Sequence, residues 1–115
     1  MSLMSRHERQ VLFRMEEYFG DGHRLRLALV GELDMAVVSQ LADRLRELRK
    51  GGYAVTVDLT RLEFIDSTGL RELIRAHADS RRDGWQLEIA DELTDQVARV
   101  IELVGARSFF WPDRA

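Results

Sequence analysis

The stretch YAVTVDLTRLEFIDSTGLRELIRAHA, from Tyr53 to Ala78, passes from a β-branched apolar segment into a helical pattern with no loop between the two. Its first part alternates apolar and polar residues, which predicts a strand buried on at least one side. After Gly69 the apolar residues recur at helical spacing, which predicts an amphipathic helix that runs to about Arg82. The strand positions are Val55, Val57 and Leu59, and the helix positions are Leu70, Leu73, Ile74 and His77.

The chain before this stretch predicts two further strands and a helix. Residues 11–18 and 24–30 alternate apolar and polar side chains around a Gly20-Asp21-Gly22 turn, which predicts an antiparallel hairpin. Helical spacing then predicts a helix that has Asp34 as its N-cap and stops at Gly51-Gly52.

The chain after this stretch predicts one more strand and helix. Residues 85–90 are typical of a strand, residues 93–104 of a helix, and residues 107–111 of a short edge strand, with Phe109-Phe110-Trp111 in core and edge packing. The complete order predicts an α/β fold. We expect one domain with a mixed sheet, in which an N-terminal antiparallel hairpin is followed by parallel βα units with right-handed crossovers.

The composition excludes several functions. The chain has 115 residues, a net charge of -3 and a pI near 5.6, and this acidic balance argues against nucleic-acid binding. It has no cysteine, which excludes disulfides and Cys-based sites. No apolar run approaches the roughly 18 residues of a membrane-spanning helix. We therefore expect a cytoplasmic protein without direct membrane insertion.

The motifs of the common enzyme classes are missing. Neither a phosphate-binding loop nor a dinucleotide fingerprint is present, and Lys50, the only lysine, ends a helix instead of completing a receiver-type phosphorylation site. No G-x-S-x-G elbow surrounds Ser67, which argues against a hydrolase triad. His7, His23 and His77 are expected to be exposed or packing residues. We predict no enzymatic activity, no cofactor and no metal.

The junction Asp66-Ser67-Thr68-Gly69 has two interpretations. Its three polar side chains can cap the free N–H groups of a helix start. Alternatively, the junction is a switch, because the positive end of a helix tolerates a phosphate on Ser67 whose charge of about -1.5 to -2 repels a docked partner. Gly69 would then leave the backbone open to that partner. The residues alone favour the cap slightly and leave both interpretations open.

Three blocks of the sequence resemble a known family. They are Gly31-Glu32-Leu33-Asp34, Val57-Asp58-Leu59 and Phe64-Ile65-Asp66-Ser67-Thr68-Gly69-Leu70. Their residues and spacing are similar to those of the STAS domain of bacterial anti-sigma factor antagonists, over roughly residues 11–110. The resemblance implies a STAS-like domain in residues 11–111. Residues 1–10 would be an N-terminal extension, with Met1-Ser2-Leu3 interpreted as a remnant of cloning, and residues 112–115 a tail.

The resemblance also implies a mechanism. Ser67, the first hydroxyl after the aspartate, would be the phosphorylation site, with Thr68 as a weaker second acceptor. An anti-sigma factor with serine kinase activity would bind the unphosphorylated protein, free its sigma factor to activate transcription, and later phosphorylate the antagonist. A serine phosphatase would reset the cycle. The expected partner-binding positions are Asp34, Asp66, Thr68, Gly69 and Arg71. Arg71 also has a simpler interpretation, which its sequence context favours, as a solvated helix residue; the alternative is a charge that favours the phosphate.

A second interpretation belongs to a different class of protein. STAS-like domains also serve as constitutive structural subunits of signalling assemblies or of membrane lipid-transport complexes. The serine at position 67 favours the antagonist, because a purely structural module needs no acceptor there.

Overall fold

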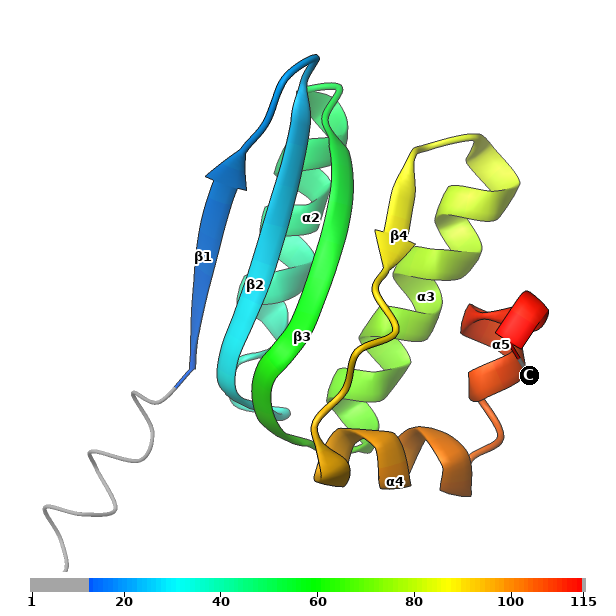
Figure 1. Ribbon diagram of the computed structural model, residues 1–115. Helices are drawn as coiled ribbons and strands as arrows, with labels where there is room; N and C mark the ends of the chain where they lie inside the picture. The colour runs from blue at the N-terminus through cyan, green and yellow to red at the C-terminus, as the bar shows by residue number, and fades with distance from the viewer. Residues whose placement is uncertain (1–12, 115) are drawn as a thin grey trace, which may run out of the picture.

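Four strands form one mixed sheet in the computed structural model, which describes residues 13–114 (Figure 1). The order is β1 (Arg14–Phe19), β2 (Arg24–Leu33), β3 (Ala54–Ile65) and β4 (Leu87–Ile89). β1 pairs antiparallel with β2, while β2 with β3 and β3 with β4 pair parallel. The predicted fold class is confirmed, including the N-terminal hairpin and the parallel units after it.

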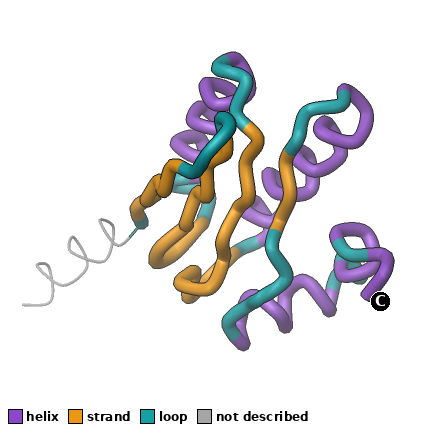
Figure 2. The backbone as a smooth tube through the Cα atoms, turned by 45° about the horizontal axis from the view of Figure 1, so that its top comes forward, coloured by secondary structure: helices purple, strands orange, loops and turns teal. Residues whose placement is uncertain are grey.

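The two long helices are α2 (Val38–Lys50) and α3 (Ser67–Asp83), and both cover the same face of the sheet (Figure 1). This follows from topology, since two right-handed crossovers that add strands in one direction place their helices on one side. Figure 2 shows α4 (Asp95–Leu103) at the end of the sheet where β3 ends, with α5 (Arg107–Phe110) following it. A short 3-10 turn, η1 (Pro112–Arg114), ends the described chain.

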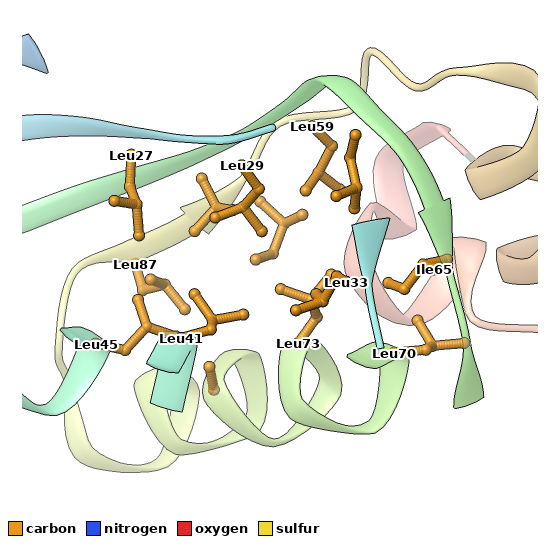
Figure 3. Close-up of a cluster of buried hydrophobic side chains, with 14 of the residues drawn as sticks. Leu27, Leu29, Leu33, Leu41, Leu45, Leu59, Ile65, Leu70, Leu73 and Leu87 are labelled. Carbon is orange, nitrogen blue, oxygen red and sulfur yellow. The ribbon is translucent and has the colours of Figure 1, made fainter. Parts of the chain in front are cut away.

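A leucine-rich core fills the space between the sheet and the two helices (Figure 3). The predicted inward positions of β3 are buried, as are those of α3 except Ile74, which is half-buried, so the periodicity identified this part of the core correctly. Fully buried side chains include Leu27, Leu29, Leu33, Leu41, Leu59 and Leu73. No helix of the described residues is both long and apolar enough to cross a membrane.

Ion pairs on both faces of the sheet hold β1 at its edge. On the helix side, Glu17 accepts two hydrogen bonds from Arg44 of α2, at 2.5 and 2.8 Å. On the open side, hydrogen bonds from the Tyr18 hydroxyl and from arginines, Arg61 among them, lower the pKa of Glu16 to about 2. The open face is therefore polar and charge-paired.

Three sequence predictions need correction. β2 continues to Leu33 and does not end near Val30, because Gly31, Glu32 and Leu33 still pair with β3. β4 is shorter than the predicted residues 85–90. Where an edge strand was predicted for residues 107–111, residues 107–110 form the short helix α5, because the N–H groups of Phe110 and Trp111 donate to the carbonyls of Ala106 and Arg107. The Trp111 indole N–H donates to the Ile89 carbonyl at 2.5 Å and fixes the chain beyond the helix. The predicted extension, His7 and the first residues of the 11–18 strand lie outside the described residues.

His77 is buried beneath α5. Its side chain is 5% exposed, and its ring packs edge-on against Phe109 and Phe110 at centroid distances of 4.9 and 5.5 Å. Within residues 13–114 its Nδ1 has no hydrogen-bond partner. Burial and the positive charge of Arg81 lower the pKa of His77 below its ordinary value of 6.5, although a hydrogen bond with the Phe109 backbone opposes the shift. His77 is thus a packing residue, as expected from the sequence, but its Nδ1 is unsatisfied.

The free energy of unfolding should depend on His77 below neutral pH. Since the unfolded chain takes up this proton more readily than the folded chain, the contribution is complete above pH 6.5 and is lost as the pH falls below it. His77→Phe should flatten this part of the stability curve in urea titrations between pH 7.5 and 5. An unchanged slope in the variant would assign the pH dependence to other groups.

Candidate functional site

The candidate site lies where β3 ends and α3 begins, at the carboxyl ends of the parallel strands. Asp66 is the N-cap of α3, with an extended backbone at φ -103° and ψ -178°, and the helix starts at Ser67. The predicted helix start after Gly69 is therefore three residues late. The N–H of Asp66 donates to the Leu33 carbonyl at 3.2 Å, which joins the ends of β2 and β3 beneath the site.

Asp66 links two segments through its carboxylate. Its Oδ1 accepts the Gly69 N–H at 2.9 Å, which is the capping bond of α3. Its Oδ2 accepts the Met35 N–H at 3.1 Å, from the loop that follows β2. Asp66 is thus a cap and, at the same time, a cross-link between the start of α3 and the segment before α2.

Asp34 lies in that same segment. The sequence predicted it as the N-cap of α2, and this prediction is wrong. Its Oδ1 accepts the Ala36 N–H at 3.0 Å, and its carbonyl oxygen accepts the N–H groups of Val37 and Val38. These bonds form a turn that precedes the helix, and Val37 occupies the N-cap position without a side-chain bond. The structure brings Asp34 and Asp66 to one end of the sheet through the Met35 bond.

Ser67 is exposed, whereas Thr68 is half-buried. Neither hydroxyl has a hydrogen-bond partner within the described part of the chain. Neither is therefore needed as a cap, because Asp66 supplies the capping bond. Of the two, Ser67 is the more accessible acceptor for a group that arrives from solvent.

Gly69 is buried and cannot serve as an open backbone surface for a partner, which corrects the sequence interpretation. A Cβ at this position would lie 2.8 Å from both the carbonyl oxygen and the Cγ of Leu33, and 3.1 Å from the Cγ1 of Ile65. Figure 3 shows Leu33 and Ile65 next to Leu70 at the start of α3. Glycine is required here because α3 packs directly onto the ends of both strands.

Two residues of the α4 region hold the end of β3, and sequence reasoning missed both. The Gln96 side chain accepts the Ile65 N–H at 2.9 Å and donates to the Ile65 carbonyl at 3.2 Å. The Thr94 hydroxyl donates to the Leu62 carbonyl at 2.6 Å. No local pattern marks these residues, because their partners lie about thirty positions earlier in the chain.

The half-buried Asp34 and the exposed Met35, Phe64, Ser67 and Arg71 around the junction form what we call the switch face. Met35 is 75% exposed and Phe64 is 38% exposed, although both are large and apolar. Arg71 is exposed and forms no ion pair with any described residue. The switch face therefore combines apolar side chains, an accessible hydroxyl and an unpaired cation.

The switch face does not have the form of a catalytic or ligand-binding cavity. A cavity of about 590 Å³ lies at the other end of the sheet, beside Tyr18, Arg24, Thr56 and Glu88. His77 is roughly 15 Å further along α3 than Ser67 by helical rise. Within residues 13–114, no group of three or more metal-ligating side chains is arranged to hold an ion.

Comparisons with known proteins agree with the resemblance noted in the sequence. The family model described as "Mlab, STAS domain" matches residues 18–109. No curated protein sequence matches the chain.

Solved structures with the same fold include three that are named as antagonists or as SpoIIAA. An anti-sigma factor antagonist from Mycobacterium paratuberculosis has 18% identity and a TM-score of 0.69, over 86% of this chain and 83% of that one. The phosphorylated form of the Bacillus cell fate determinant SpoIIAA has 17% identity and a TM-score of 0.63, over 80% and 84%. The STAS domain of an antisigma-factor antagonist from Rhodobacter sphaeroides has 22% identity and a TM-score of 0.58, over 76% and 97%. At these identities the likeness shows the fold.

Replacing Gly69 by alanine should destabilise the protein. The overlap with Leu33 costs about 1–3 kcal/mol as overpacking, and the higher helix propensity of alanine returns at most about 1 kcal/mol. We expect a net loss of about 1–2 kcal/mol in chemical denaturation. Ser67→Ala, at an exposed position of the same turn, is the matched control and should change stability by less than about 0.5 kcal/mol. Equal stability of the two variants would contradict the close packing.

Substitutions of Asp66 should separate its two roles. Asp66→Ala removes both bonds and should cost about 1–2 kcal/mol. Asp66→Asn keeps the oxygen that accepts the Gly69 N–H. Its N–H₂ group would face the Met35 N–H, and because both groups are donors the bond to Met35 would be lost. Hydrogen exchange should then accelerate at Met35 while the Gly69 amide stays protected. Faster exchange at Gly69 alone would show that the cross-link to Met35 is not formed.

Proposed function

This chain belongs to the STAS domain family, and on that premise we propose that it is an anti-sigma factor antagonist whose docking is controlled by phosphorylation of Ser67. The observation that supports this proposal most directly is the accessible Ser67 hydroxyl in the first turn of α3, which no capping bond occupies. Asp66 already caps the helix. Ser67 is thus available for modification without loss of the local fold.

The proposed reaction is phosphoryl transfer from ATP, catalysed by the partner. The Ser67 oxygen forms a bond to the γ-phosphorus, the bond from that phosphorus to the β,γ-bridging oxygen breaks, and ADP leaves. The serine proton passes to a base of the kinase. The antagonist contributes the acceptor and its position only, so it is not itself an enzyme.

A phosphate at Ser67 would be tolerated by the fold but not by a docked partner. The free N–H groups and the dipole at the start of α3 favour negative charge. At a docked interface, the same phosphate would bring about -1.5 to -2 charges beside the apolar Met35 and Phe64. Burying that charge in the interface carries a large desolvation cost, so the complex would dissociate.

The proposed partners follow from this cycle. An anti-sigma factor with serine kinase activity would bind the switch face of the unphosphorylated form, and its sigma factor would be free to activate transcription. Phosphorylation would end the contact, and a serine phosphatase would restore Ser67. All of these events belong to the cytoplasm. Asp34 and the exposed Met35 would contribute contacts beside Ser67.

A second candidate function is a constitutive structural subunit of a signalling assembly or a membrane lipid-transport complex. The specific observation behind it is the description of the family model, which names a Mlab STAS domain and not an antagonist. In that case the same face would bind its partner permanently, and Ser67 would stay unmodified.

Phosphorylation assays should distinguish the two functions. The wild-type chain, incubated with ATP and each anti-sigma-type serine kinase encoded in the native genome, should take up one phosphate that mass spectrometry maps to Ser67. Thr68→Ala should be phosphorylated normally and Ser67→Ala should not. If Ser67→Ala took up phosphate at the wild-type level, Ser67 would not be the phosphorylation site. If none of the kinases transferred phosphate to the wild-type chain, the structural subunit would be favoured.

Binding assays test the proposed charge block. Ser67→Glu should weaken binding to the phosphorylating kinase by at least about tenfold, or ~1.4 kcal/mol, whereas Ser67→Ala should bind like the wild type. Calorimetry or surface plasmon resonance gives the two dissociation constants. Equal affinities would refute the charge block even if Ser67 is the acceptor.

A further inference from the structure

The arginines on the outer side of α3 differ in their charge partners. Arg75 pairs with Glu72 at 2.5 Å and with Asp79 at 2.9 Å, and Arg82 pairs with Asp79 and Asp83. Arg71, near the start of α3, and Arg81, near its end, form no ion pair with a described residue. None of the helix neighbours of Arg71 three and four positions away carries a carboxylate. These neighbours are Ser67, Thr68, Ile74 and Arg75.

The position of Arg71 is unfavourable in the unmodified helix. Side chains of a helix lean toward its N-terminus, so Arg71 extends over the first turn, where the dipole already supplies positive charge. Arg75, one turn later, adds a like charge. The first turn of α3 contains no acidic residue, and the Asp66 carboxylate is engaged by two backbone N–H groups. Arg71 therefore stands one helical turn from Ser67 without an ion pair to any described carboxylate, Asp34 of the switch face included.

Resting on the proposed function, we propose that Arg71 is the intramolecular counter-ion of phosphorylated Ser67. An anion at position 67 and a cation at position 71 have the i, i+4 spacing and the N-to-C order that stabilise a helix. The planar guanidinium is suited to hold two phosphate oxygens. Arg71 is thus a positioning residue that stabilises the phosphorylated, partner-free form and lengthens its lifetime.

Phosphorylation of Ser67 would therefore change the charge of the switch face in two ways. In the unphosphorylated form Arg71 is free on the switch face and available to a partner. In the phosphorylated form it is committed to the phosphate, so one modification removes a cation from the docking surface and adds an anion to it. A partner that docks through acidic groups near Arg71 would lose both contacts at once.

The test uses the full chain with phosphoserine installed at position 67 by genetic encoding, so that no kinase is needed. Phosphorus NMR titration then gives the second pKa of the phosphate, which is near 6 in an isolated phosphoserine. A neighbouring cation favours the dianion and lowers this pKa. Arg71→Gln should therefore raise it by about 0.5 unit, a threefold change in proton affinity, and Arg71→Lys should raise it less.

The matched control is Arg81→Gln, which removes an exposed arginine of the same helix about 20 Å from position 67 by helical rise. It should leave the phosphate pKa unchanged, and about 1 M salt should abolish the difference between the wild type and Arg71→Gln. An equal pKa in the wild type and Arg71→Gln, or an equal shift in both glutamine variants, would overturn the proposal.

The outcome is separable from that of the proposed function. If Arg71→Gln shifts the phosphate pKa but no kinase modifies Ser67, the counter-ion exists and the antagonist function fails. If a kinase modifies Ser67 and the pKa is the same with and without Arg71, the antagonist function stands and the counter-ion is refuted.

Discussion

The close approach of α3 to the end of β2, made possible by Gly69, is the constraint on which the candidate site depends. With no Cβ at this position, the helix start lies directly against Leu33 and Ile65. That distance lets the Asp66 N–H reach the Leu33 carbonyl and lets the Asp66 carboxylate reach Met35. A wider separation would break these bonds together, because all of them cross the same gap.

This packing fixes the backbone of the junction and leaves several of its side chains exposed to solvent. The backbone of the junction is fixed from below by β2, from one side by the Met35 loop, and from the other by Gln96 of α4. The side chains that face solvent, Ser67 and Phe64 among them, take no part in this bonding. A change of charge at Ser67 can therefore alter what binds the surface while the fold beneath it stays the same.

The two faces of the sheet and its carboxyl end offer different surfaces to a partner. Helices α2 and α3 cover one face, and ion pairs such as Arg26 with Asp58, at 2.6 Å, neutralise charge on the other. The switch face joins exposed apolar side chains to Arg71, which forms no ion pair with a described residue. Its exposed side chains remain available to a partner, because other polar groups form the hydrogen bonds that hold the junction together.

The sequence by itself determined strands β1 to β4, helices α2 to α4, the buried positions of β3 and the presence of a hydroxyl at Ser67, because these depend on local periodicity and on residue identity. The alternation of these elements also indicated the parallel pairing that follows the N-terminal hairpin. The tertiary structure decided which of the junction residues are structural. Gly69 is buried against Leu33, and Asp66 is a cross-link to Met35. Both depend on partners about thirty residues away, which a pattern within a short window cannot reveal. Asp34 forms a local turn and no cap, and residues 107–110 fold as a helix.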